Sequence, residues 1–309
     1  MNFNDPLLKP VRILLFPFSL LYALAVWTRN TLYNAGVLRS QTFELPLICV
    51  GNLSAGGTGK SPMVEYLVRL LSPKFNSAVL SRGYKRKTEG YLLADANASA
   101  ATIGDEPMQI FRKFPAITVA VGEKRAAAIP EILRERPSTD FILLDDAFQH
   151  RQVKAGINIL LTDFNELYAD DWFLPTGNLR DEKRSADRAE IIVVTKCPNG
   201  LNTEQKDKIR NKLNPKIHQN LFFTTIAYGA PYHIFSNHAL NPEDAKEVLL
   251  ITGIANPVPL REELSSKAWM ADEMIFADHH EYSEKDIAGI KEKFQAMNIS
   301  QKIIITTEK

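Results

Sequence analysis

The sequence predicts an α/β fold in which a mostly parallel sheet carries helices on both faces, followed by a smaller second α/β domain and preceded by a membrane-interface helix. Three observations predict it: short apolar runs alternate with amphipathic stretches, a glycine-rich loop separates the first such pair, and an uncharged run lies near the amino terminus. The 309 residues are 45% hydrophobic and 24% charged, a composition that excludes fibrous, coiled-coil and disordered chains. A chain of this length favours two domains over one.

The uncharged run spans residues 13–27 (ILLFPFSLLYALAVW) and is flanked by Arg12 and Arg29. Fifteen helical residues reach about 22 Å, short of the roughly 30 Å hydrocarbon core, and Pro17 would kink or end a helix. Its aromatic residues and basic flanks are typical of a helix that lies in the interface rather than crossing the bilayer. A buried core helix is the alternative. We expect residues 1–35 to form this interfacial region.

In residues 36–228, strand-like apolar runs alternate with helical patterns, as in a single α/β domain. Helical patterns cover 62–71, 105–113, 123–135 and 203–213. The intervening apolar runs predict strands at Leu45–Val50, Ser77–Ser81, Ile117–Val121, Phe141–Leu144, Ile157–Thr162 and Ile191–Thr195.

The alternating pattern is interrupted near residue 225, through Tyr228-Gly229-Ala230-Pro231. Residues 229–309 are predicted to form the second, smaller domain. Helices are expected near 259–267 and at 283–297. Strands are expected at Val248–Thr252, Met274–Ala277 and Lys302–Thr306.

The strongest chemical signal is a phosphate-binding loop between a strand and a helix, which makes the fold one of the P-loop NTPase type. Glycines let backbone N–H groups surround phosphate oxygens, and the helix N-terminus adds positive potential. Lys60 can reach the β- and γ-phosphates, and the Ser61 hydroxyl can ligate Mg²⁺. Ser54 stands where the strict pattern has glycine. The residues expected to bind the ATP phosphates are Ser54, Ala55, Gly56, Gly57, Thr58, Gly59, Lys60 and Ser61.

A phosphate-binding loop predicts a carboxylate at the end of a neighbouring apolar strand, and residues 141–146 (FILLDD) fit that expectation. We expect Asp145 to hold Mg²⁺ directly or through water, while Asp146 assists or orients water. Taken alone, the pair could be a strand end with a capping acid.

Overall charge and cysteine content exclude other classes. With 37 basic and 36 acidic residues the net charge is +1, so no general field favours nucleic acid. Cys49 and Cys197 lie far apart, which indicates neither a disulfide framework nor a zinc ribbon.

Three further clusters stay open on the residues alone. Asp105 begins a helical pattern and can be an N-cap or a catalytic acid–base group. The basic residues that follow Arg82 can be a solvated loop or a patch for an anionic headgroup. The segment 278–280 (Asp-His-His) can be a loop feature or supply a base.

Taken together and in order, these motifs closely resemble the tetraacyldisaccharide 4′-kinase family, lipid A kinases of Gram-negative bacteria, from the apolar amino-terminal helix to the last residues. The segments that carry the resemblance are Asn52 with 56–62, 81–84, 104–107, 145–150, Pro175, Gly177, 179–180, 252–257, Phe276 and 278–280.

The resemblance implies transfer of the γ-phosphate of ATP, with Mg²⁺, to the 4′-hydroxyl of tetraacyldisaccharide 1-phosphate, giving lipid IVA. It implies a peripheral protein on the cytoplasmic face of the bacterial inner membrane, with a glycolipid substrate, no nucleic acid and no obligate protein partner. It also implies that Asp105 accepts the hydroxyl proton while His279, with His280 as runner-up, tunes or orients it, and that Lys60 stabilises the transferred group. Because the two groups lie in different domains, we expect domain closure to assemble the site. Substrate binding would fall to Arg82, Gln149 and Arg180.

The chain departs from the family pattern at Asp181, where glutamate is expected and a shorter carboxylate would weaken a metal contact. Rival classes are a membrane-associated P-loop ATPase or GTPase switch or metallochaperone, and a non-catalytic binding module. Residues 195–198 (Thr-Lys-Cys-Pro) partly match the guanine-reading motif Asn-Lys-x-Asp but lack both outer residues, which argues against GTP.

Overall fold

The computed structural model describes residues 9–234, 236, 238–240, 247–254, 256–267, 269–278, 280–297 and 301–308. The chain divides into two compact units, Met1–Ile226 and Ala227–Lys309, and the amino-terminal helices belong to the first.

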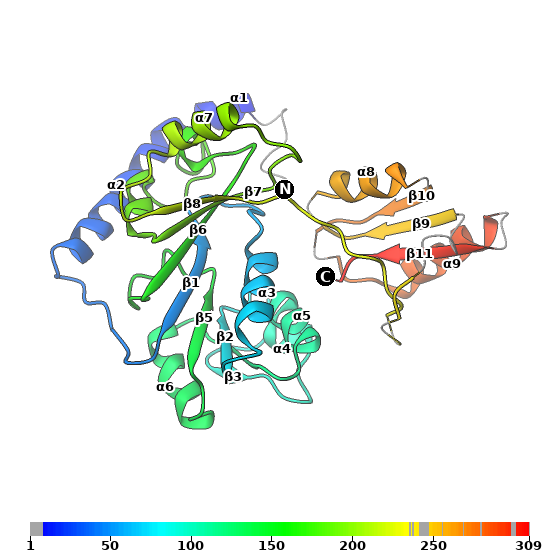
Figure 1. Cartoon of the computed structure of the whole chain (residues 1–309), viewed down its shortest axis with the longest axis horizontal. Helices are drawn as coiled ribbons and strands as arrows, with labels where there is room; N and C mark the ends of the chain where they lie inside the picture. The colour runs from blue at the N-terminus through cyan, green and yellow to red at the C-terminus, as the bar shows by residue number, and fades with distance from the viewer. Residues whose placement is uncertain are drawn as a thin grey trace. The chain divides into compact units, whose positions relative to one another are not determined.

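The first unit is built on an eight-stranded sheet in the order β3-β4-β2-β5-β1-β6-β7-β8, in which every neighbouring pair is parallel except β3 with β4 (Figure 1). The predicted mostly parallel sheet is therefore confirmed. Its strands are β1 (Leu47–Asn52), β2 (Ser77–Ser81), β3 (Leu92–Leu93), β4 (Thr118–Val121), β5 (Phe141–Asp145), β6 (Ile157–Asp163), β7 (Ile191–Thr195) and β8 (Asn220–Phe223). The sequence analysis missed β3 and β8, because a two-residue strand and a half-exposed edge strand carry little periodic signal.

Helices cover both faces of this sheet, because alternate residues of each strand point to opposite sides. On one face Val50, Val79 and Leu143 pack against α3 and α5. On the other face Cys49 and Leu144 belong to a cluster that includes residues of α6 and α7. The helices are α3 (Lys60–Leu71), α4 (Ala100–Ile103), α5 (Asp105–Lys113), α6 (Arg125–Glu135) and α7 (Thr203–Leu213), with 3₁₀ turns at Tyr168–Asp170 and Lys183–Arg188.

The amino-terminal region forms two helices, α1 (Lys9–Leu14) and α2 (Phe16–Asn34), with α2 at the periphery of the first unit (Figure 1). Pro17 lies in the first turn of α2, where its missing N–H costs nothing, so it marks a helix start. Among the described residues, no helix has both the length and the apolar character needed to cross a membrane.

The side of α2 that faces the protein is polar, and its exposed side is apolar. Ser19 Oγ donates to the carbonyl oxygen of Phe173, and Tyr22 Oη donates to that of Arg180. Asn30 is buried and donates to Asp181 Oδ1 at 2.7 Å. The exposed apolar residues of the two helices are Ile13, Leu14, Phe16, Phe18, Leu20, Leu21, Leu24, Trp27 and Leu32. The alternative of a buried core helix is therefore wrong.

The second unit is a three-stranded parallel sheet in the order β10-β9-β11. Its elements are β9 (Glu247–Thr252), α8 (Val258–Ser266), β10 (Met270–Ile275), α9 (Glu284–Ala296) and β11 (Lys302–Thr306). The strand expected at 274–277 was misplaced, since β10 begins four residues earlier. It is an edge strand whose Asp272 and Glu273 pair with Lys293 and Arg261, so charges interrupt the apolar pattern that reveals buried strands.

Candidate functional site

The phosphate-binding loop is held between its own strand and two neighbouring segments. The N–H of Ala55 donates to the carbonyl oxygen of Asn178 at 2.7 Å, and Thr195 Oγ1 donates to that of Thr58 at 2.8 Å. Gly59 caps α3 with φ +85°, a conformation that L side chains rarely adopt. The loop thus places the N-terminus of α3, whose first residues are Lys60 and Ser61, at the carboxyl edge of the sheet.

Lys60 lies in a cluster of charged and polar groups around Asn52, the last residue of β1. Lys60 Nζ is 3.3 Å from Asn52 Oδ1 and 3.8 Å from Asp146 Oδ1. The Arg180 guanidinium donates to the same Asn52 oxygen and to Asp146 Oδ1 at 3.0 Å. Burial alone would raise the pKa of Asp146, but Lys60 and Arg180 outweigh it and lower that pKa. The predicted residues Lys60, Asp146 and Arg180 are thus brought together.

Asp145, at the end of β5, is in a different environment from its neighbour. Its Oδ2 accepts from Ser81 Oγ at 3.2 Å, whereas its Oδ1 is buried and has no hydrogen-bond partner among the described residues. Burial, and then the charges of Glu106 and Asp146, raise the pKa of Asp145 to about 7.

An oxygen ligand that is buried and unpartnered fits a divalent cation, which would favour the ionised carboxylate. Asp145 therefore fits a role as Mg²⁺ ligand better than Asp146, whose oxygens already contact Arg180 and Lys60. In the part of the chain that the structure describes, no group of three or more His, Cys, Asp or Glu side chains could hold a metal ion.

Sequence reasoning gave no role to three residues that belong to this site: Asn52, Glu106 and Arg125. Arg125, the first residue of α6, is only 2% exposed, and its guanidinium donates to the carbonyl oxygen of Gly122 at 2.8 Å. Burial lowers the pKa of Arg125, and the negative charges of Asp145 and Asp146 partly offset this effect. It therefore places a positive charge behind the two acids. Asn52 and Glu106 stood within the recognised motifs, whereas the local sequence gave no sign that Arg125 is buried.

Asp105 is the first residue of α5, and Gly104 occupies the N-cap position. The N-cap interpretation of Asp105 is therefore wrong. Gly104 has φ +92°, and a Cβ there would lie 3.1 Å from the carbonyl oxygen of Tyr84. This close approach joins the start of α5 to the loop that follows β2, and so fixes where Asp105 stands at the carboxyl edge.

We expect Gly104→Ala to lower the free energy of unfolding by about 1–3 kcal/mol, because alanine is strained at this φ. It should also lower turnover, since Asp105 would shift, while ATP affinity stays within about threefold of wild type. Urea denaturation and nucleotide titration measure the two effects. Gly90→Ala is the matched control, because Gly90 has φ +78° but open space around its Cβ position. Equal turnover in the two variants would contradict the positioning role.

The basic segment after β2 contains one exposed candidate and one structural residue. Arg82 is exposed. The side chain of Arg86, by contrast, is only 2% exposed and pairs with Glu123 at 2.5 Å. The segment is therefore only partly a free basic patch, and Arg82 remains its candidate for binding an anion.

Gln149 and Asp181 both make contacts within the protein. The side-chain amide of Gln149 donates to the backbone carbonyl oxygen of Asn52, and the backbone carbonyl of Gln149 accepts from Arg29 of α2. Asp181 is fully buried and accepts hydrogen bonds from Asn30, Ser185 and Arg188. These bonds account for the carboxylate at 181 without a metal.

The predicted catalytic histidine, His279, lies outside the described residues. His280, the runner-up, has its Nε2 3.1 Å from Asp286 Oδ2, and its ring stacks on Phe276 at 4.7 Å between centroids. Hydrogen bonds from Ser283, supported by the contact with His280, lower the pKa of Asp286 to about 2.

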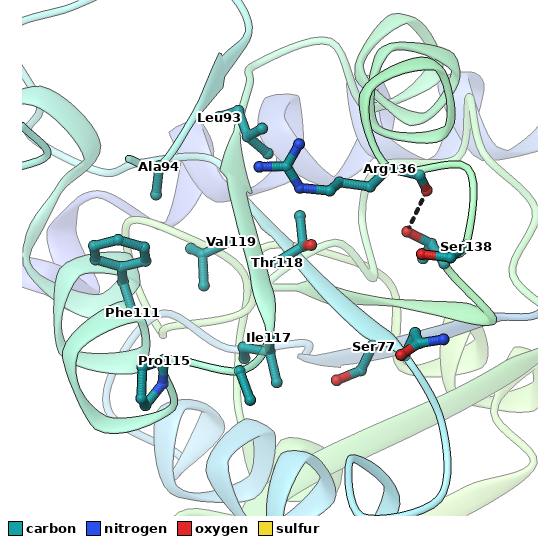
Figure 2. A pocket seen from close by; sticks show the side chains of 13 residues that line it. Ser77, Leu93, Ala94, Phe111, Pro115, Ile117, Thr118, Val119, Arg136 and Ser138 are labelled. Carbon is teal, nitrogen blue, oxygen red and sulfur yellow. Dashed lines mark hydrogen bonds between the residues drawn. The ribbon is translucent and has the colours of Figure 1, made fainter. Parts of the chain in front are cut away.

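Two cavities lie in the first unit. One of about 330 Å³ is at the amino ends of β2 and β4, where Figure 2 shows Phe111 and Pro115 on one side and the turn that carries Arg136 and Ser138 on the other. The Thr139 hydroxyl donates to the carbonyl oxygen of Arg136 in that turn, at 2.8 Å. A second, of about 780 Å³, lies beside α1, lined by residues including Arg12, Phe16 and Trp172. The charged cluster itself is at the carboxyl edge, where parallel α/β sheets bind ligands.

Comparisons with known proteins give one consistent family. The family model described as tetraacyldisaccharide-1-P 4′-kinase matches residues 11–309. The tetraacyldisaccharide 4′-kinase of Flavobacterium johnsoniae is 48% identical over 301 residues, which cover 97% of this chain and 86% of that protein. The one from Bacteroides thetaiotaomicron is 44% identical over 307 residues, covering 96% and 81%.

Among solved structures, LpxK from Aquifex aeolicus, crystallised in complex with ATP, superposes with a TM-score of 0.76 at 29% identity. The superposition covers 96% of this chain and 88% of that one. The chain belongs to the tetraacyldisaccharide-1-P 4′-kinase family.

Proposed function

We propose that this protein transfers the γ-phosphate of ATP to the 4′-hydroxyl of tetraacyldisaccharide 1-phosphate, producing lipid IVA in lipid A biosynthesis. The observation that carries the proposal is the arrangement at the P-loop, where Lys60 lies beside Asp146 and Asp145 is buried with an unpartnered oxygen. Family membership over almost the whole chain supplies the acceptor, and the ATP-bound relative supports the nucleotide.

The groups at the loop would bind and stabilise the triphosphate. The loop amides of residues 54–61 and the Lys60 ammonium would hold its oxygens, and Asp145 with Ser61 would hold Mg²⁺. Bound Mg²⁺ would neutralise charge that develops on the transferred phosphoryl group. Asp146, paired with Arg180, would keep Arg180 and Lys60 aligned toward the γ-phosphate. We therefore place Arg180 at the triphosphate rather than at the acceptor.

Asp105 would accept the proton of the 4′-hydroxyl, with His279 as the group that tunes or orients it. We prefer His279 to His280 because His280 already contacts Asp286. Arg82, exposed at the end of β2, would bind the 1-phosphate of the substrate. The side chain of Gln149 would support the loop through Asn52 rather than bind substrate.

We further propose that the protein is peripheral to the cytoplasmic face of the inner membrane and lies there on α2, with no nucleic acid and no obligate protein partner. The support is the exposed row Leu20, Leu21 and Leu24 together with Trp27, opposite a hydrogen-bonded polar side. Burying such residues in the acyl boundary would be favourable.

Replacing Leu20, Leu21 and Leu24 together with glutamine should raise KM for lipid presented in bilayer vesicles by about tenfold or more, because each leucine side chain adds roughly 1.5–3 kcal/mol when buried. ATP affinity should not change. The polar contacts of α2 remain in this variant, so it tests the surface without removing the helix. Ile217→Gln, at a fully exposed apolar residue outside α2, is the control. An unchanged KM on vesicles would exclude insertion through this face.

The function itself is tested by transfer of label from [γ-³²P]ATP to tetraacyldisaccharide 1-phosphate in detergent micelles. The kinase proposal predicts that label enters the lipid at the 4′ position. Hydrolysis of ATP without labelled lipid would instead favour a switch ATPase.

A further inference from the structure

We infer that Lys196, at the end of β7, is a positioning residue for the nucleoside half of ATP, and that it contacts the base through the apolar stem of its side chain. This inference rests on the proposed kinase function. It concerns residues 195–198, a motif that the roles above do not use.

The order of the sheet places this turn beside the P-loop, on the side away from the metal ligand. Strand β1 lies between β5, which ends at Asp145, and β6, and β7 follows β6. If Mg²⁺ and the γ-phosphate face Asp145, the nucleoside must leave the loop toward the ends of β6 and β7. Those ends are in register, because Asp163 pairs with Thr195.

The end of β7 contacts the loop at the point where α3 begins. The Cβ and Cγ2 of Thr195 lie 3.9 Å from the position a Cβ would take on Gly59, and its hydroxyl donates to the Thr58 carbonyl. A nucleotide whose phosphates occupy the N-terminus of α3 therefore has the next residue, Lys196, within reach of its sugar and base.

Lys196 is held in one orientation across this edge. It has φ +55°, and its Nζ is 2.8 Å from Asp163 Oδ2 on the adjacent strand end. Asp163 is itself fixed, since its Oδ1 accepts from the Asn165 N–H at 2.9 Å. The next residue, Cys197, is buried, and its backbone N–H donates to the carbonyl oxygen of Thr224.

With its ammonium bound to Asp163, the four-carbon stem of Lys196 spans the two strand ends while the side chain stays one-third exposed. An apolar stem with one open side suits stacking on the flat face of a base. The next side chains, Cys197 and Pro198, offer no strong hydrogen-bonding group for the base edge, so contact with the face rather than the edge is expected.

The test compares two ligands of the full-length protein with Mg²⁺ present: ATP, and inorganic tripolyphosphate, which lacks a nucleoside. Lys196→Ala should raise Kd for ATP about tenfold and leave Kd for tripolyphosphate unchanged. Lys196→Met, which keeps an unbranched apolar stem, should stay within about threefold of wild type for both. Lys208→Ala, at an exposed lysine of α7, is the control.

Unchanged tripolyphosphate binding also shows that the variants keep a folded loop. Equal weakening of both ligands would make Lys196 a phosphate contact, and a methionine variant as weak as alanine would show that the ammonium carries the effect. Either result overturns the inference, as does normal ATP binding by Lys196→Ala. These binding measurements contain no lipid, so they do not depend on the kinase proposal. That proposal would fail in a separate assay, if wild-type protein bound ATP but transferred no label to the lipid.

Discussion

Lys60→Ala is expected to lower kcat about 100- to 1,000-fold, the effect of removing one preorganised charge from a phosphoryl-transfer site. The ammonium lies at the N-terminus of α3, 3.3 Å from Asn52 Oδ1 and 3.8 Å from Asp146 Oδ1. In the proposed mechanism it would be held where charge develops on the γ-phosphate. Single-turnover transfer of label to the lipid, at saturating ATP and Mg²⁺, measures the loss.

The variant should remain folded, because Arg180 still pairs with Asp146 at 3.0 Å and keeps that carboxylate from being buried alone. Lys113→Ala is a matched control: its side chain is 23% exposed against 16% for Lys60, and it pairs with Glu65 at 2.7 Å. The control should keep near-normal kcat. If Lys60→Ala turned over within tenfold of Lys113→Ala, the lysine would not be stabilising the transferred group.

The features that could be predicted from the sequence are those whose cause is local. A glycine must stand at residue 59 because the backbone there has φ +85°, so the loop is visible as a pattern of residue types. Strands β2 and β7 coincide with their predicted ranges, because both faces are covered, nearly every residue is buried and the middle of each strand is apolar. Asp145 could be found because it directly follows such a strand.

Features that depend on residues far apart in the chain could not be predicted. Arg125 stands in a sequence that suits an exposed helix start, yet it is buried, with its guanidinium bonded to the Gly122 carbonyl and interacting with the charges of Asp145 and Asp146. Likewise, composition indicated an interfacial helix but not its polar inner side. That side had a faint signal, since Ser19, Tyr22 and Asn30 recur at helical spacing within an apolar run.

Asp105→Asn is expected to lower kcat about 100- to 10,000-fold, the range for loss of a general base, with ATP affinity within about threefold of wild type. Asparagine keeps the shape of the side chain but cannot accept the proton of the 4′-hydroxyl. Gly104 is the N-cap, so Asp105 does not cap α5, and its place in the first turn adds a favourable helix-dipole contribution of about 0.3–1 kcal/mol. A purely structural role would change Tm and leave the turnover of the folded protein nearly unchanged.

The two roles can be separated with Glu204→Gln, which removes an exposed acid from the first turn of α7 and so costs only the dipole contribution. Both variants should remain folded, while only Asp105→Asn loses transfer to the lipid. The remaining enzyme should still bind ATP with Mg²⁺, since Lys60, Asp145 and Asp146 are untouched. If Asp105→Asn kept more than a tenth of wild-type kcat, or lost ATP affinity in proportion to kcat, Asp105 would not be the base, and the acceptor proton would have to leave by another group.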